Sequence, residues 1–525
     1  MSGQQWESET QYWLGVIGYA VGYGNVWRFP YFLFTYGGPA FMLPYILSLV
    51  FLGIPVFLIE NSIGQMMGHP VSVFRKIHPK FRGIGVSGMI LAILICQYYV
   101  VLLAWTLIFL VNSFQSPLPW SEPKGGNPWN EDYFEDEVLM TSGNISETGS
   151  VHPHLVLALI FSWVLVYLCI WKGVKGAGKI LYVTAPAPYV ILFCLFLRGI
   201  TLEGAGKGLE FMVSTELENF FSLTPWRMAG NQVLFSLGMG ANAMVLFAAY
   251  REKTQRLVRS SIILPIINSC TSLLACATIY TFIGHISSEE NLDIEELPLD
   301  GPKLAFIAYP ISLALMPGNN FWAVAFFAML LMLGLDSEFA LVEAFVSFLE
   351  EEKLTNLRRE YSAAVVCAAG CLFGLVFTVD SGQYVLYLFD RYTSSISVFL
   401  IVLLEVVVVV WIYGVQNLSE EVHKHTGEEF PQWMKRIMKY VTPVICGLLF
   451  VMALVSEFLE PPEDFPWWAV LLGWLITCTT LFPLVYFAVF GKEEEKQEIE
   501  MKSPESNEAQ NNPEEQKEEM QDIEI

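Results

Sequence analysis

Charged residues are scarce in this sequence. Asp, Glu, Lys and Arg together make up 15% of its 525 residues, whereas they make up about a quarter of ordinary soluble domains. Hydrophobic residues account for 54%. This balance excludes a soluble globular domain of ordinary composition.

Histidines and cysteines are present, but they do not form the patterns that build metal centres, disulfide frameworks or catalytic sites. The seven histidines are scattered, with no HExxH motif and no His/Cys cluster, which argues against a metalloenzyme. All nine cysteines fall in apolar segments rather than in hydrophilic loops, so we expect no structural disulfide. Because no nucleophile–base constellation is visible either, we expect neither an enzyme nor an organic cofactor.

Long apolar runs fill most of the chain instead. Runs of about 20 residues cross roughly 30 Å of hydrocarbon as helices, and lipid forces each spanning segment to satisfy its own backbone hydrogen bonds. The sequence therefore predicts an all-α polytopic membrane protein, embedded in the lipid bilayer by twelve transmembrane helices. They are expected at residues 13–36, 40–67, 85–113, 154–171, 179–198, 229–250, 258–284, 321–349, 361–379, 384–416, 438–458 and 466–490.

The net charge of −23 lies mainly outside these runs. The tail from Gly491 holds 13 acidic and 4 basic residues, and such an acidic surface argues against a nucleic-acid partner. With the N-terminus inside, the cytoplasmic segments carry 22 of the 29 Lys and Arg residues. By the positive-inside rule we therefore expect both termini in the cytoplasm.

The hydrophilic segments divide the chain further. We expect a cytoplasmic N-terminus at 1–12, a twelve-helix domain at 13–490, extracellular loops at 115–153 and 286–320, and a disordered tail at 491–525. Asn144 in the first loop is a candidate glycosylation site, and an unused sequon is the equal alternative. The terminal Ile523-Glu524-Ile525 is a candidate docking peptide for an accessory or scaffold protein, although an unread chain end is the favoured alternative. The sequence predicts no particular oligomeric state.

Two spans, the first and the sixth, are interrupted by glycine and asparagine. They contain Gly18-Tyr19-Ala20-Val21-Gly22-Tyr23-Gly24-Asn25 and Ser236-Leu237-Gly238-Met239-Gly240-Ala241-Asn242. Unwound backbone at mid-membrane is tolerated only around a cavity or ligand. Paired interruptions in corresponding helices indicate a midplane site in an inverted five-helix repeat. Close helix packing through small residues is the alternative.

Several motifs resemble those of the neurotransmitter:sodium symporter family, from about Trp6 to Phe490. They are Gly24-Asn25-Val26-Trp27-Arg28-Phe29-Pro30-Tyr31, Gly37-Gly38, Gly53-Ile54-Pro55, Gly64-Gln65, Gln97-Tyr98-Tyr99, Gly334-Leu335-Asp336-Ser337 and Ser381-Gly382-Gln383-Tyr384. The resemblance implies a plasma-membrane symporter that couples Na⁺ and Cl⁻ gradients to solute uptake by alternating access.

The resemblance also implies ion sites. The first sodium site would use the Ala20 carbonyl, Asn25, Ser236, Asn268 and the carboxylate of the substrate. The second would use the Gly18, Val21 and Leu333 carbonyls with Asp336 and Ser337. Chloride would lie among Tyr45, Gln232, Ser236 and Ser272. Oxygen ligands of this kind suit a hard cation such as Na⁺.

A substrate pocket and its gates are implied in the same way. The pocket would be lined by Tyr23, Gly24, Ile95, Tyr99, Phe235, Gly238, Ala241, Ser337, Glu338 and Leu341. The outer gate would consist of Tyr99, Phe235 and an Arg28–Asp390 ion pair. Glu60 would satisfy the broken sixth span. Gly3 replaces the N-terminal gate arginine of the family, so the inner gate is weak or uses another base opposite Glu351.

The substrate is read from departures within the resemblance. Gly22 stands where monoamine carriers place an Asp, which favours an amino acid or a similar zwitterion. Glu338 replaces an uncharged residue, which favours a cationic or polar side chain unless Glu338 is protonated or turned toward Asn242 or water. The alternatives are a carrier of an amine or osmolyte such as GABA, taurine or betaine, and a non-transporting accessory paralogue.

Overall fold

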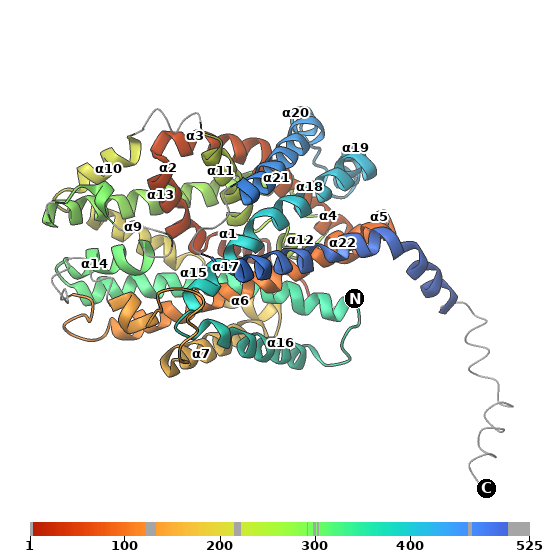
Figure 1. Ribbon diagram of the computed structural model, residues 1–525. Helices are drawn as coiled ribbons and strands as arrows, with labels where there is room; N and C mark the ends of the chain where they lie inside the picture. The colour runs from red at the N-terminus through yellow and green to blue at the C-terminus, as the bar shows by residue number, and fades with distance from the viewer. Residues whose placement is uncertain are drawn as a thin grey trace, which may run out of the picture.

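The computed structural model describes residues 4–121, 133–214, 222–290, 292–297, 301, 304–459 and 465–501. Within these ranges the chain forms a bundle of helices (Figure 1). Ten helical stretches in the described residues are long and apolar enough to cross a membrane. The first and sixth crossings are further helices that break near their middle, so the predicted all-α polytopic fold is confirmed.

The spans follow the predicted order. The first five are α1 (Glu9–Ala20) with α2 (Phe29–Tyr36), α3 (Gly38–Ser48) with α4 (Ile54–Met67), α6 (Arg82–Asn112), α7 (Pro153–Ile170), and α8 (Val174–Thr184) with α9 (Ala187–Gly199). The next five are α11 (Leu223–Ser236) with α12 (Ala243–Ala249), α13 (Val258–Glu290), α15 (Asn319–Glu351), α16 (Arg359–Gly374), and α17 (Gly382–Tyr392) with α18 (Val398–Val406) and α19 (Val415–Thr426). The last two are α21 (Thr442–Leu459) and α22 (Trp467–Met501).

Short helices connect some of these spans. They are α5 (Pro70–Ile77), α10 (Ala205–Val213), α14 (Tyr309–Ala314) and α20 (Gln432–Arg436). The helices α5 and α22 lie near one end of the bundle in Figure 1, and the N-terminus is at that same end, opposite α10 and α14. An even number of crossings brings the C-terminal end of α22 to the same side of the bundle as the N-terminus (Figure 1).

Apolar side chains lie both inside and outside the bundle. The buried core includes Phe57, Leu103 and Phe326 on α4, α6 and α15. By contrast, Leu448 on α21 and Phe482 on α22 are large apolar side chains exposed to the surroundings. An exposed apolar belt of this kind is expected of a surface that faces lipid.

Several helix boundaries differ from the prediction. The helix α13 extends to Glu290 rather than ending at 284, and the tenth span continues as α19 to Thr426 rather than ending at 416. The helix α11 begins at Leu223 rather than at 229, because the Ser222 side chain caps it by accepting from the Thr224 N–H. The helix α22 continues to Met501, so residues 491–501 are helical rather than disordered. Their Glu and Lys residues are good helix formers, which hydropathy does not register. The remaining tail at 502–525, like Gly3, lies outside the described residues.

Candidate functional site

The break in the first span follows from where its N–H groups point. The Gly22 N–H donates to Asn25 Oδ1 at 3.0 Å, and the Tyr23 N–H donates to the Tyr99 hydroxyl at 3.2 Å. The Asn25 N–H donates to the Gly22 carbonyl at 3.1 Å. In a continuous helix these N–H groups would instead serve the carbonyls four residues earlier, which are those of Gly18, Tyr19 and Val21. The break therefore frees a row of carbonyl oxygens.

The break in the sixth span rests on left-handed backbone. Gly238, Gly240 and Asn242 have φ angles of 63°, 76° and 61°, a region that glycine and asparagine enter most readily. The Gly240 N–H donates to Glu60 Oε1 at 2.8 Å, which confirms the predicted role of Glu60. The Asn242 side chain donates to the Gly85 carbonyl at 2.7 Å, which ties the break to α6.

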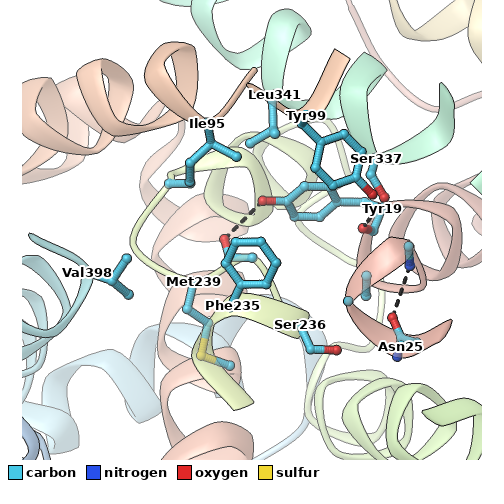
Figure 2. A pocket seen from close by; sticks show the side chains of 15 residues that line it. Tyr19, Asn25, Ile95, Tyr99, Phe235, Ser236, Met239, Ser337, Leu341 and Val398 are labelled. Carbon is cyan, nitrogen blue, oxygen red and sulfur yellow. Dashed lines mark hydrogen bonds between the residues drawn. The ribbon is translucent and has the colours of Figure 1, made fainter. Parts of the chain in front are cut away.

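The two breaks lie side by side. The Tyr19 hydroxyl donates to the Gly238 carbonyl at 3.0 Å, and Gln232 Nε2 donates to the Gly24 carbonyl at 2.8 Å. A cavity of about 50 Å³ lies between them. Figure 2 shows the rings of Tyr19, Tyr99 and Phe235 gathered around it. This volume holds a few waters, so a solute would require the surrounding helices to move apart.

Most of the residues predicted for the substrate pocket line this cavity. They are Gly24, Ile95, Tyr99, Phe235, Gly238, Ala241, Ser337 and Leu341. Tyr23 and Glu338 are not part of the lining. The Tyr23 hydroxyl instead bonds to Thr106 Oγ1 at 2.9 Å inside the protein. The cavity wall also contains Tyr19, Met239 and Val398, which the sequence analysis missed.

Glu338 lies behind the cavity wall. Its side chain is fully buried beside the thiol of Cys96, which follows the lining residue Ile95. Apart from that thiol, a weak donor, neither carboxyl oxygen has a hydrogen-bond partner in the described part of the chain. Asn242, the partner considered from the sequence, donates to the Gly85 carbonyl. A buried carboxyl group without a partner is costly, so it needs a proton or a ligand donor.

Four of the five residues predicted for the second sodium site converge, namely Gly18, Leu333, Asp336 and Ser337. Ser337 Oγ donates toward the carbonyls of Tyr19, Leu333 and Gly18, at 3.0, 3.2 and 3.5 Å. The neighbouring Asp336 is buried, and its Oδ2 accepts no hydrogen bond from any described residue. A methyl group on Gly18 would lie 2.8 Å from this oxygen. A carboxylate oxygen without a donor beside freed carbonyls fits a small hard cation.

The residues predicted for the first sodium site form a hydrogen-bonded chain. Asn25 Nδ2 donates to Asn268 Oδ1 at 2.8 Å, and Asn268 Nδ2 donates to Ser236 Oγ at 2.8 Å. Ala20, Asn25 and Ser236 also line the cavity. The set offers oxygen atoms but no carboxylate. A ligand with its own negative charge would therefore complete it.

The predicted chloride residues adjoin this chain. Asn25 Nδ2 donates to Ser272 Oγ at 2.8 Å. The Tyr45 hydroxyl bonds to Ser269 Oγ at 3.0 Å and also lies beside the Ser272 hydroxyl. Gln232 contributes an amide and Ser236 a hydroxyl to the same region. These amide and hydroxyl groups are neutral hydrogen-bond donors, which fit an anion such as chloride.

A thin layer separates the cavity from a larger space. Arg28 and Asp390 form an ion pair at 3.5 Å, and the Arg28 guanidinium lies 4.2 Å from the centre of the Phe235 ring. Arg28 and Asp390 line a vestibule of about 760 Å³, whereas Phe235 lines the cavity. The predicted gate residues therefore stand between vestibule and cavity. Asn144, the predicted glycosylation site, is exposed and also lines the vestibule.

The opposite side of the cavity is closed by several layers. The Trp6 indole donates to the Phe247 carbonyl at 3.0 Å, and its backbone N–H donates to the Tyr250 carbonyl at 3.1 Å. The Tyr250 hydroxyl donates to Glu343, which pairs with Arg359 at 2.5 Å. His69 Nδ1 lies 3.6 Å from Glu351, which makes His69 the candidate base opposite Glu351.

A loop beside the vestibule is fastened to the turn just before α17, at Val379 and Asp380. The His152 ring lies 2.6 Å from Asp380, and the Ser150 N–H donates to the same carboxylate at 3.1 Å. Although desolvation opposes it, the hydrogen bonds from His152 and Ser150 lower the pKa of Asp380. Val151 also pairs with Val379 through the backbone. We call residues 142–152 with Asp380 the loop latch.

Comparison with known proteins gives a consistent picture. The sequence model of the "Sodium:neurotransmitter symporter family" matches residues 3–132 and 127–493. The "Sodium- and chloride-dependent GABA transporter 2" of Rattus norvegicus is 33% identical, over 93% of this chain and 86% of the relative. The taurine transporter of Canis lupus familiaris is 35% identical, over 92% and 84%. The creatine transporter 1 of Homo sapiens is 34% identical, over 91% and 81%.

Proposed function

Because this chain belongs to the sodium:neurotransmitter symporter family, a family of solute transporters rather than enzymes, we propose that it imports a small zwitterionic solute across the plasma membrane. Uptake is driven by sodium, and chloride accompanies it. Both termini are cytoplasmic, so the vestibule opens to the outside. We expect an amino acid or a solute of similar charge.

The row of freed carbonyls beside Asp336 carries this proposal. Three N–H groups of the first span point away from their helical acceptors, and Asp336 Oδ2 faces the same region without a donor among the described residues. The Gly18 and Tyr19 carbonyls share the single hydrogen of Ser337 Oγ. A buried carboxylate oxygen without a donor in a membrane protein costs several kcal/mol unless a ligand satisfies it. Sodium supplies that ligand at the second site.

The first sodium site supports a substrate that carries a carboxylate or another acidic group. Its predicted ligands are neutral, and three of them line the cavity. Gly22 has no room for an amine-binding side chain, because a Cβ there would lie 2.5 Å from the Tyr99 hydroxyl. The acidic end of the solute therefore approaches the break, while the rest of it displaces Phe235 and Leu341.

The matched relatives favour a second candidate for the substrate class. GABA, taurine and creatine, which are named in their descriptions, are zwitterions without an α-amino group: GABA and taurine carry a more distant amine, and creatine carries a guanidinium group. An ω-amino acid, a sulfonate or a guanidino acid is therefore the alternative to an α-amino acid. Glu338 beyond the cavity wall supports a remote cationic group, since its carboxyl oxygens have no partner in the described chain apart from the weakly donating Cys96 thiol.

Uptake into cells that express this chain tests the proposal. Labelled α-amino acids, ω-amino acids and guanidino acids are offered with sodium or choline, and with chloride or gluconate. We expect accumulation that needs sodium and falls without chloride. An Asp336→Asn variant present at the cell surface in the same amount should lose the sodium-driven uptake. Absence of uptake by wild-type protein shown at the cell surface would instead support a non-transporting accessory protein.

A Glu338→Gln variant tests the part assigned to Glu338. Removing the acidic group should weaken uptake of solutes with a remote cationic group by about tenfold, the loss expected for a charge-assisted hydrogen bond. Uptake of neutral solutes should change little. The measurement is the half-saturating concentration of each solute at saturating sodium. Equal losses for cationic and neutral solutes would contradict a selective role.

A further inference from the structure

Thr184 lies at the end of α8, beside the second sodium site. It is the last residue of that helix, and the span resumes at Ala187 after Pro186. Its side chain is half-buried and comes within hydrogen-bond distance of Asp336, 152 residues further along the chain. Nothing in the local sequence marks this threonine, because it lies in an apolar run without charged neighbours.

The Thr184 hydroxyl has one hydrogen to donate and two acceptors within reach. The Ile180 carbonyl of its own helix is 3.3 Å away, whereas Asp336 Oδ1 is 2.8 Å away. The shorter contact is also the stronger one, since hydrogen bonds to a carboxylate are about twice as strong as those between neutral groups. The hydroxyl therefore serves Asp336.

Because of this bond, the two oxygens of the Asp336 carboxylate have different surroundings. Oδ1 is held by Thr184, while Oδ2 lies against Gly18 without a donor among the described residues. Because the group is planar, fixing one oxygen fixes the direction of the other. We propose that Thr184 is a positioning residue of the second sodium site, which holds Asp336 Oδ2 toward the freed carbonyls of the first span.

This inference rests on the proposed function and adds a residue outside the predicted ligand set. Without the hydroxyl, the carboxylate would lose an oriented partner and rotate between several positions. Sodium would then have to order the group on binding, which weakens affinity. Loss of a hydrogen bond to a charged group is expected to weaken the affinity for sodium about tenfold. The contacts that Phe235 and Leu341 make with the solute are not changed.

Sodium-dependent thermal unfolding of the purified full chain tests this role. Sodium chloride replaces choline chloride at constant ionic strength, and the sodium concentration that gives half of the stabilisation is measured. Thr184→Val keeps the shape and removes the hydroxyl, whereas Thr184→Ser keeps the hydroxyl. Thr479→Val is the matched control, because the Thr479 hydroxyl donates to Leu475 of its own helix on the exposed side of α22.

We expect Thr184→Val to need about tenfold more sodium, while Thr184→Ser and Thr479→Val behave as wild type. In uptake assays the same variant should raise the half-saturating sodium concentration and leave the KM for solute at saturating sodium unchanged. Should Thr184→Val fail to fold, Thr184→Ala replaces it. An unchanged sodium requirement in the Val or Ala variant, or an equal defect in Thr184→Ser, would overturn the inference. A wild-type protein that sodium does not stabilise would overturn the proposed function as well.

Discussion

Gly18 leaves no space for a side chain beside the Asp336 carboxylate. A Cβ at this position would approach Asp336 Oδ2 to 2.8 Å and the Asp336 Cβ to 3.0 Å. Glycine is therefore required here by the close approach of α1 to α15, rather than by an unusual φ angle. The same closeness places the Gly18 carbonyl 3.5 Å from Ser337 Oγ.

A Gly18→Ala substitution should separate the two helices and impair the second sodium site. We expect sodium-dependent uptake to fall by about tenfold or more, since a displacement of about 1 Å is enough to spoil a preorganised site. Gly447→Ala is the control, because no other atom lies within 4 Å of a Cβ built on Gly447. That change should leave uptake intact. Normal sodium-dependent uptake by Gly18→Ala would contradict the assignment of Gly18 to the site.

Single residues mark the limit of what the sequence predicts. Motif resemblance placed Tyr99, Phe235 and Ser337 correctly at the cavity. It also placed Glu338 there, although this side chain turns toward Cys96 behind the wall. Val398 follows a π-helical turn in the tenth span and carries no motif. The direction of a side chain depends on packing between helices, which a local pattern does not contain.

The broken helices were predictable as elements, but their partners were not. Repeated glycines and an asparagine at mid-span mark both breaks in the sequence itself. The N–H groups released by the first break bind Asn25 nearby and Tyr99, which lies 76 residues from Tyr23. Distant partners of this kind follow from the fold. A sequence can therefore predict where a helix is interrupted without predicting which residues stabilise the interruption.

Substitutions of Asn242 should separate two contributions to the stability of the break in the sixth span, the side-chain hydrogen bond and the left-handed backbone conformation. It has a φ angle of 61° and donates to the Gly85 carbonyl. Asn242→Gly keeps the backbone freedom and loses one hydrogen bond, which costs about 1 kcal/mol. Asn242→Ala also forces alanine into the left-handed region, for roughly 1–2 kcal/mol more. The free energy of unfolding, measured at equilibrium in detergent, should be highest for wild type, lower for Asn242→Gly and lowest for Asn242→Ala. Equal values for the two variants would show that the backbone of residue 242 is not strained by alanine.

The loop latch should depend on pH through Asp380. Its pKa is lowered in the folded protein, so the stabilisation is present above the ordinary aspartate pKa of about 3.9 and is lost as the pH falls through the lower folded value. We expect the amide hydrogens of residues 142–152 to exchange faster in Asp380→Ala than in wild type at pH 7 and pH 5. This difference should begin to shrink as the pH falls below about 4 and should vanish only once the pH lies below the folded pKa of Asp380.

Ser146→Ala provides a control for the loop latch, since Ser146 lies in the same loop and its N–H donates to Asn144 instead. Hydrogen exchange measured by mass spectrometry resolves the loop from the helices. Equal exchange in wild type and Asp380→Ala at pH 7 would show that the carboxylate does not hold the loop.

The number and order of the crossings followed from hydropathy, because lipid imposes length and apolarity on every span. The far end of α22 did not follow, since its charged residues 491–501 form a helix outside the apolar run. The two interrupted crossings fall short of the length that a continuous span requires. The sequence nevertheless predicts them as spans at 13–36 and 229–250, with the glycine and asparagine pattern marking each interruption.

The cavity is closed on both sides, but the barrier toward the vestibule is thinner than the barrier on the opposite side. On the vestibule side the barrier is one thin layer, in which Arg28 pairs with Asp390 and lies over the Phe235 ring. Successive contacts close the other side, made by Trp6, Tyr250, Glu343 and Arg359. Asp390→Asn should therefore speed release of bound solute toward the vestibule by about tenfold, because Arg28 loses its charged partner. Dilution of labelled solute from purified protein measures this rate.

Asp390→Glu keeps the charge and is the matched control for this release experiment. It should release solute at nearly the wild-type rate. Should Asp390→Asn also release solute no faster than wild type, the ion pair would not be the barrier between cavity and vestibule.

The depth of the vestibule has an electrical consequence. Salt solution filling a space of about 760 Å³ conducts well, so little of the membrane voltage falls across it. Most of the voltage then falls over the short closed region between Arg28 and the Glu343–Arg359 pair. Each elementary charge that crosses the full voltage exchanges about 2.3 kcal/mol per 100 mV. An ion at the breaks therefore needs to move only a short distance to draw on most of that energy.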